Sequence, residues 1–320
     1  MSALPTPGEV LGSSEIASCV AIVLYGIVVV QAYVYFLHYK EDPRWLKGLV
    51  GAVTFLETLH SVLIIHILYT FGVTDFGHLE FVQSITWSVA VSLLIDLCII
   101  ATVQGFYIRR IWILSNRSIW LVVILSTILF TRISFGIATF TLMLTLDNWL
   151  SFRQEIGPLF TVAFGIALAL FMDFLIASVL IFYLLRNRSG LRRTDHIVTF
   201  LIAYAVNTGA ITMVVSAAIV FTFVFLKSSL LFAGLNIASG KLYANSLLGT
   251  LNARQILRER HDIPSVTTNY FSNGSRASDM VFKQPIRVQN KSGSRTMVES
   301  ATQHSDIEES GPTKHDVYVA

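Results

Sequence analysis

The sequence has few charged residues and only two cysteines. Asp, Glu, Lys and Arg make up 13% of its 320 residues, whereas soluble domains average about 25%. This shortage excludes an ordinary soluble domain. Cys19 and Cys98 both fall inside apolar runs, so no disulfide framework is predicted. The sequence also lacks the alternating segments of roughly ten residues that are typical of a membrane barrel.

Long apolar runs dominate what is present. Hydrophobic residues make up 54% of the chain, and the mean hydropathy is +0.65. A helix needs roughly 20 apolar residues to cross a bilayer. The sequence therefore predicts an all-α, polytopic transmembrane bundle of seven helices within residues 16–251. The predicted spans are 16–39, 48–72, 83–108, 119–143, 157–184, 198–225 and 229–251.

Basic residues alternate between the loops that separate these spans. The first, third and fifth loops contain Lys40, Arg44, Lys47, Arg109, Arg110, Arg117, Arg186, Arg188, Arg192 and Arg193, and the other loops only Arg153 and Lys227. Lys and Arg accumulate in cytoplasmic loops. Residues 1–15 are therefore predicted to be a short segment outside the cytosol, and the C-terminus is predicted to be cytosolic. All five Trp lie near predicted span ends, as in an interfacial belt.

The C-terminal region has a different composition. Residues 261–320 are rich in Ser, Thr, Gly and charge, so they bury too little surface to fold alone and are predicted to form a disordered cytosolic tail. Ser278 and Thr296 follow arginines and are candidate phosphorylation sites. Residues 252–260 are either a juxtamembrane helix or a basic flank. The basic loops and the tail are the predicted contacts for cytosolic partners, and the lipid bilayer is the predicted surroundings of the rest.

Five ionisable residues lie inside the predicted spans, where a charge costs about 2.5–3.5 kcal/mol on insertion scales. We expect them to face the bundle interior and to pair, Lys241 with Asp96 and Arg132 with Asp173, which leaves Glu57 as the acid without a partner. The alternative to a binding role is an architectural one that fixes helix register. The candidate binding cluster is Glu57, His60, Asp96, Arg132, Asp173, Asn207, Lys241, Tyr243 and Asn245.

Polar and small residues also follow helical spacing, which places them on one face of each helix. Such stripes are Ser88, Ser92, Asp96 and Gln104; Thr161, Gly165, Ala169 and Asp173; and Tyr204, Thr208, Thr212 and Ser216. The last span has two polar faces: Asn236, Ser239, Tyr243, Ser246 and Thr250 on one, Lys241 and Asn245 on the other. We expect neighbouring helices to wrap this span, or a cavity to border it.

No motif points to a reaction, so no enzyme activity, cofactor, metal or nucleic-acid partner is predicted. Lys241 and Asp96 fit a retinal Schiff base and its counter-ion only superficially. Ile237 stands where an acid is expected, and residues 198–225 contain no Trp or Pro. Glu57 and His60 share a face that suits a metal ligand pair, but residues 229–251 contain no His.

Topology and tail favour a receptor-like or sensing protein whose small-molecule ligand is unknown, in the plasma membrane rather than in internal membranes. A transporter of small solutes, ions or protons is the alternative, since buried charges often mark ion pathways. No pair of spans broken by Pro or Gly indicates a midplane transport site.

Two segments resemble a known family. They are DFLIASVLIFYLLRNRSGLRRTDHIVTFLIAYAVNTGAIT, starting at Asp173, and KLYANSLLGTLNAR, starting at Lys241. Over about residues 165–254 they resemble fungal, chiefly basidiomycete, integral membrane proteins that carry domain of unknown function 6534. The segment VQGFYIRRIWILS, starting at Val103, is similar more weakly. The resemblance implies a multi-span membrane protein without an established activity, cofactor or site.

Overall fold

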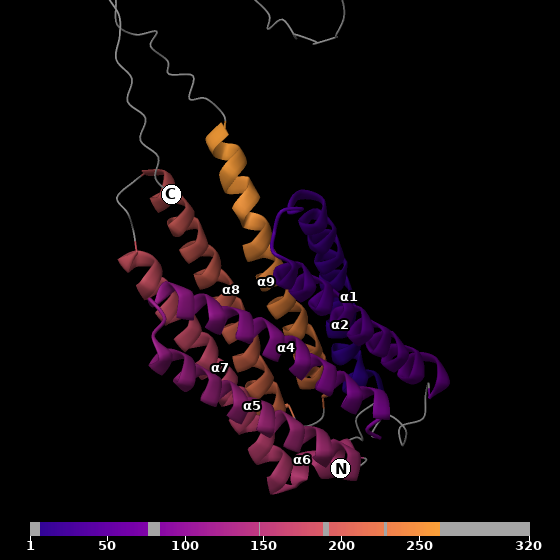
Figure 1. Cartoon of the computed structure of the whole chain (residues 1–320). Coiled ribbons are helices and arrows are strands. Elements are labelled where there is room, and N and C mark those ends of the chain that lie inside the picture. The colour runs from indigo at the N-terminus through magenta and orange to yellow at the C-terminus, as the bar shows by residue number, and fades with distance from the viewer. Residues whose placement is uncertain (1–6, 76–83, 147, 188–191, 227–228, 263–320) are drawn as a thin grey trace, which may run out of the picture. The chain divides into compact units, whose positions relative to one another are not determined.

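Seven long helices and two short helical segments make up the described part of the chain (Figure 1). The computed structural model describes residues 7–75, 84–146, 148–187, 192–226 and 229–262, without the side chains of 7–9, 192–208 and 255–262. Within these ranges no strand forms, which confirms the all-α prediction. The elements are α1 (Pro7–His38), α2 (Arg44–Tyr69), η1 (Thr70–Thr74), α4 (Trp87–Leu114), α5 (Ile119–Leu146), α6 (Trp149–Gln154), α7 (Ile156–Arg186), α8 (Arg192–Phe225) and α9 (Leu231–Asp262).

Five predicted spans are confirmed as helices long and apolar enough to cross a bilayer. These five are Val10–His38, Arg44–Thr74, Trp87–Leu114, Ile119–Leu146 and Ile156–Arg186. In α8 the apolar stretch of the described residues is the shorter Gly209–Phe225. The seventh predicted span falls largely within α9, which is longer than predicted and much more polar than the first five.

Several predicted boundaries were wrong. α1 begins at Pro7, so part of the predicted N-terminal segment 1–15 is helical. The third predicted span corresponds to α4, which ends at Leu114 and not at residue 108. α9 continues without a break to Asp262 and so contains residues 252–260. The predicted tail, with Ser278 and Thr296, lies outside the described residues apart from its first two positions.

Contacts between loops define one end of the bundle, which we call the α6 end. There the Leu230 amide donates to the Val10 carbonyl at 3.0 Å, joining α9 to the start of α1. Arg153 of α6 donates to the carbonyls of Leu226 and Ser229 at 3.0 and 2.7 Å. Burial lowers the pKa of Arg153 to about 10, so its guanidinium remains a cation at neutral pH and ties α6 to the α8–α9 connection.

The opposite end, which we call the basic end, holds the first and third basic loops. Arg254 of α9 pairs with Asp42 of the α1–α2 loop at 2.6 Å, and the Tyr35 hydroxyl donates to the same carboxylate at 2.9 Å. The Asn187 amide after α7 donates to the Leu114 carbonyl at 2.9 Å. Arg109 of the third predicted loop lies over the Trp45 ring beside the first loop, at 3.7 Å. The described basic residues of these loops therefore lie at one end of the bundle, as the alternation predicts, and Arg153 lies at the α6 end.

α9 is the buried centre of the bundle. No residue between positions 229 and 254 is exposed, and α9 contacts α1, α2, α4 and α8. Figure 1 shows it between α1 and α8. A polar helix with so little lipid contact is stable only if its polar groups are paired inside the protein.

Six polar side chains of α9 bond residues of neighbouring elements. The partners are the Glu57 carboxylate for Lys241, the Asp173 carboxylate for Tyr243, the Leu24 carbonyl for Asn245, the Tyr107 hydroxyl for Ser246, the Gln31 carbonyl for Asn252 and the Asp42 carboxylate for Arg254. They belong to α2, α7, α1, α4, α1 and the α1–α2 loop. The prediction that neighbours wrap this helix is confirmed, and its low hydropathy follows from its position.

The Asp42–Arg254 ion pair is partly exposed, so its contribution to stability should be smaller than that of a buried ion pair. The side chains are 17% and 36% exposed, and exposed pairs contribute about 0–1 kcal/mol. We expect Asp42→Asn to lower the free energy of unfolding by at most about 1 kcal/mol. Titration of the full chain with SDS in detergent micelles measures this change. A much larger loss would show that this pair is a main support of the basic end.

Candidate functional site

A fully buried ion pair joins α9 to α2. Lys241 Nζ lies 2.6 Å from Glu57 Oε2, and both side chains are 0% exposed. The same ammonium donates to Ser61 Oγ at 2.8 Å and to the Glu57 carbonyl at 3.2 Å. All three donor positions of the ammonium are therefore used. The predicted pairing of Lys241 with Asp96 was wrong, because Glu57 takes that place.

The neighbouring position, Gly240, explains where Asp96 goes instead. A Cβ at Gly240 would lie only 1.8 Å from Asp96 Oδ1, so the carboxylate rests directly against the bare backbone of α9. Consecutive side chains on a helix point about 100° apart. Lys241 therefore points toward α2 while position 240 faces α4. The sequence places Asp96 and Lys241 at the same depth in the bundle, but in the structure Asp96 packs against a different face of α9 from the one that carries Lys241.

A second cluster lies where α4, α5, α7 and α9 meet. The Tyr243 hydroxyl donates to Asp173 Oδ2 at 2.5 Å, and Gln104 Nε2 donates to Asp173 Oδ1 at 3.2 Å. The Arg132 guanidinium carbon lies 5.6 Å from the centroid of the Tyr243 ring, within cation–π range. The predicted ion pair of Arg132 with Asp173 was also wrong, since Tyr243 stands between the two charges.

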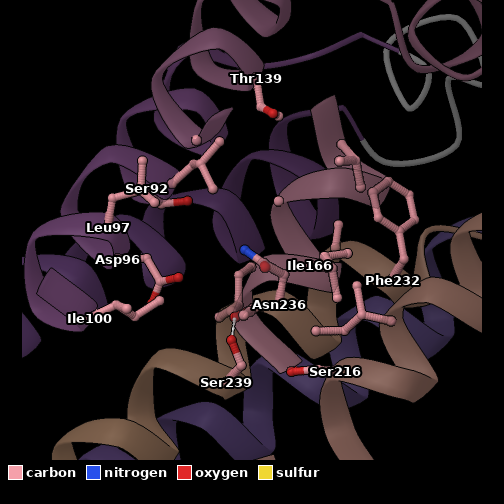
Figure 2. Close-up of a pocket in the computed structure, with 18 of the residues that line it drawn as sticks. Ser92, Asp96, Leu97, Ile100, Thr139, Ile166, Ser216, Phe232, Asn236 and Ser239 are labelled. Carbon is pink, nitrogen blue, oxygen red and sulfur yellow. Dashed lines mark hydrogen bonds between the residues drawn. The ribbon is translucent and has the colours of Figure 1, made fainter. Parts of the chain in front are cut away.

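The interior contains a cavity of about 130 Å³, which we call the main cavity. Its lining comes from α2, α4, α5, α6, α7, α8 and α9. On α4, α5, α7, α8 and α9 the lining residues lie mainly in the half of the helix nearer the α6 end. Most of the surface is apolar, with a few polar groups between, the usual composition of a small-molecule site. In Figure 2, Ser92 and Asp96 on one wall point toward Asn236 on another.

Four residues that line the main cavity carry buried polar atoms without a hydrogen-bond partner among the described residues. The atoms are Asp96 Oδ1, Arg132 Nη1, Trp149 Nε1 and both ring nitrogens of His60. These side chains are at most 9% exposed. Buried polar groups in native proteins are nearly always paired with protein, water or ligand. The cavity therefore offers both donors and acceptors to whatever enters it.

A smaller cavity of about 40 Å³, the second cavity, lies toward the basic end. It is lined by Asp173 and Gln104, together with Tyr107, Thr212 and others. Tyr243 lines both cavities. The ring of Tyr243, held by its hydrogen bond to Asp173, is thus a partition between the two.

The structure divides the predicted binding cluster into three groups. His60, Asp96, Arg132 and Tyr243 line the main cavity, and Asp173 lines the second cavity. Glu57, Lys241 and Asn245 line neither cavity and bond neighbouring helices instead. The side chain of Asn207 lies outside the described residues.

All three predicted stripes meet the main cavity. Ser92 and Asp96 line it from α4, Thr161, Gly165 and Ala169 line it from α7, and Ser216 lines it from α8. Sequence reasoning missed Trp149, which it assigned only to an interfacial belt. No pattern marks this residue, since it enters the interior from the six-residue helix α6, where its ring packs on Phe232 at 5.6 Å.

Among the described residues, no group of three or more His, Cys, Asp or Glu side chains could hold a metal ion. What the main cavity offers chemically is noncovalent recognition by one carboxylate, one guanidinium, one imidazole and several hydroxyls. The helices and this interior define a multi-pass α-helical membrane protein with an internal cavity that is mostly apolar and carries a few polar groups.

Residues 169–256 match DUF6534, a family of unknown function. The matched segment runs from the middle of α7 through α8 into α9, and it contains Asp173, Lys241 and the polar residues of α9 described above. Neither the comparison with curated proteins nor that with solved structures gives a significant match.

Proposed function

We propose that this protein is a receptor-like or sensing membrane protein of seven spans that binds a small molecule in the main cavity. The observation that carries the proposal is the set of buried, unpartnered polar atoms that converge on that cavity from four elements. Such groups are costly to bury unless something pairs with them. The volume of about 130 Å³ is near that of an engineered cavity of about 150 Å³ that holds benzene, so the ligand is small.

The proposal includes an orientation in which the α6 end faces outward and the basic end faces the cytosol, following the positive-inside rule. α8 and α9 then cross the bilayer as the sixth and seventh spans, and the tail is cytosolic, open to kinases and other partners. The plasma membrane is the proposed location. Fungal, basidiomycete origin and the absence of enzyme activity, which the sequence and its resemblance predict, are part of the same proposal.

A transporter of small solutes or ions is the second candidate, favoured by one observation. Tyr243 lies between the two cavities, and movement of its ring would connect them. The two candidates differ in which end of the bundle gives access to each cavity. A receptor binds from one side only, whereas alternating access exposes a central site to both sides in turn.

Cysteine labelling distinguishes the two without knowledge of the ligand. In a cysteine-free background (Cys19→Ala, Cys98→Ala), Ser92→Cys reports on the main cavity and Ser246→Cys on the second. Leu150→Cys and Lys40→Cys mark the α6 end and the basic end, both at exposed positions. A membrane-impermeant thiol reagent is applied to intact cells or to inverted vesicles of the full-length variants.

For the receptor-like proposal we expect Ser92→Cys and Leu150→Cys to react only from outside the cell. Lys40→Cys should react only from the cytosolic face. Labelling of Ser92→Cys from both faces would overturn the proposal in favour of transport. Labelling of Leu150→Cys from the cytosolic face alone would overturn the orientation.

A further inference from the structure

We infer that the main cavity binds a small organic monocation with an apolar body, such as a primary amine, and that Asp96 is its counter-ion. This inference rests on the proposed function and names the chemical class of its ligand. Three observations carry it: the balance of buried charges, the Asp96 carboxylate without a hydrogen bond among the described residues, and the apolar walls of the cavity.

The buried charges of the described interior do not balance. Lys241 and Glu57 cancel each other at 2.6 Å. The remaining three are the acids Asp96 and Asp173 and the base Arg132, each at most 9% exposed. Among the described side chains buried to this extent, one acid therefore lacks a counter-ion. A bound monocation restores neutrality, whereas a bound anion doubles the imbalance.

Asp96 is the acid that is left over. Both oxygens of Asp173 already accept hydrogen bonds, from Tyr243 and Gln104. Asp96 Oδ1 has no partner among the described residues, and its side chain is only 2% exposed. The Arg132 charge is shared, since it lies within electrostatic range of both acids. A buried carboxylate in this position is expected to bind either a proton or a cation.

The walls of the cavity favour an organic cation over a hydrated inorganic one. Leu93, Leu97 and Ile166 surround the polar groups, and Phe232 and Trp149 line the part nearest the α6 end. Figure 2 shows Phe232 and Ile166 across the cavity from Asp96. The Phe232 ring already faces the Arg153 guanidinium, 4.5 Å from its centroid, so Trp149 is the ring that adds cation–π attraction for an entering ammonium. Ser92 donates to the Val89 carbonyl at 2.8 Å, so its oxygen is left as a further acceptor.

Three probes of one shape and different charge test the inference: benzylamine, benzyl alcohol and benzoate. Binding to the purified full chain in lipid nanodiscs is measured by calorimetry at neutral pH. We expect benzylamine to bind about 10- to 100-fold more tightly than benzyl alcohol, as a charge-assisted hydrogen bond predicts, and benzoate to bind least. Asp96→Asn, which keeps the shape of the side chain, should remove the preference for benzylamine. Asp42→Asn, at the basic end, should leave it unchanged.

The ranking in the unaltered protein is a test that does not depend on whether Asp96→Asn folds. Equal binding of benzylamine and benzyl alcohol would show that Asp96 holds a proton, and would overturn the inference. Preference for benzoate would overturn it as well and would make Arg132 the anchor. If none of the probes binds at millimolar concentration while Ser92→Cys still reacts only from outside, the ligand class is wrong and the receptor-like proposal stands.

Discussion

Lys241→Met is expected to lower the free energy of unfolding by about 3–5 kcal/mol, the usual cost of removing one partner of a buried ion pair. Methionine fills much of the same volume, but it leaves the Glu57 carboxylate with no counter-ion in a position that is 0% exposed. Titration of the full chain with SDS, followed by tryptophan fluorescence, measures the loss. The yield of folded protein should fall with it.

A matched control and a double variant make this prediction specific. Lys47→Met removes a lysine that is only half-buried and that donates to the Lys40 carbonyl, so its effect should be below about 1 kcal/mol. Adding Glu57→Leu to Lys241→Met should restore most of the stability, because apolar pairs often replace buried ion pairs at no cost. A Lys241→Met variant as stable as Lys47→Met would show that Glu57 is neutral without Lys241.

The double variant also tests whether the Lys241–Glu57 pair has a structural role only or takes part in ligand binding. Lys241 and Glu57 do not line the main cavity. The double variant should therefore keep the benzylamine preference once it folds. Loss of binding in a stable double variant would place the pair in the ligand site after all.

The sequence predicts the helices well because each carries its own signal. Apolar length marks five of them, and the two polar faces of α9 predict a helix surrounded by neighbours. The loop charges predict which ends lie together. These properties depend on one segment at a time, so no knowledge of packing is needed to derive them.

The partners inside the bundle depend on how each helix is rotated about its own axis, which the sequence does not encode locally. Glu57 was predicted to be the acid left over, and it is instead the partner of Lys241. A rotation of α9 by about 100°, one residue's step on a helix, is the difference between Lys241 facing Asp96 and Lys241 facing Glu57. Trp149 and the main cavity depend on seven elements at once, so they were not predictable from any single stripe.

Gly240 is the residue that lets Asp96 pack against α9. We expect its substitution to lower both the stability of the protein and its affinity for benzylamine. In Gly240→Ala the new Cβ would lie 1.8 Å from Asp96 Oδ1 and 3.0 Å from Asp96 Cγ. The carboxylate must retreat by more than an ångström, out of contact with α9. We expect overpacking to cost about 1–3 kcal/mol of unfolding free energy, and the displaced carboxylate to lose at least about 10-fold in benzylamine affinity.

The control is Gly209→Ala, where the new Cβ would meet the Ala177 Cβ at an ordinary 3.5 Å. Because alanine favours helix over glycine by about 1 kcal/mol, Gly209→Ala should be neutral or stabilising.

A double variant, Gly240→Ala with Asp96→Ala, tests the cause of the loss. Shortening the obstructing Asp96 side chain should restore the stability that Gly240→Ala loses. The affinity for benzylamine should stay lost in that pair, since the counter-ion is gone. If stability recovers and amine binding does not, the steric role of Gly240 is distinguished from the role of the Asp96 charge in binding. A Gly240→Ala variant that is as stable as Gly209→Ala and binds benzylamine normally would contradict this arrangement of α4 and α9.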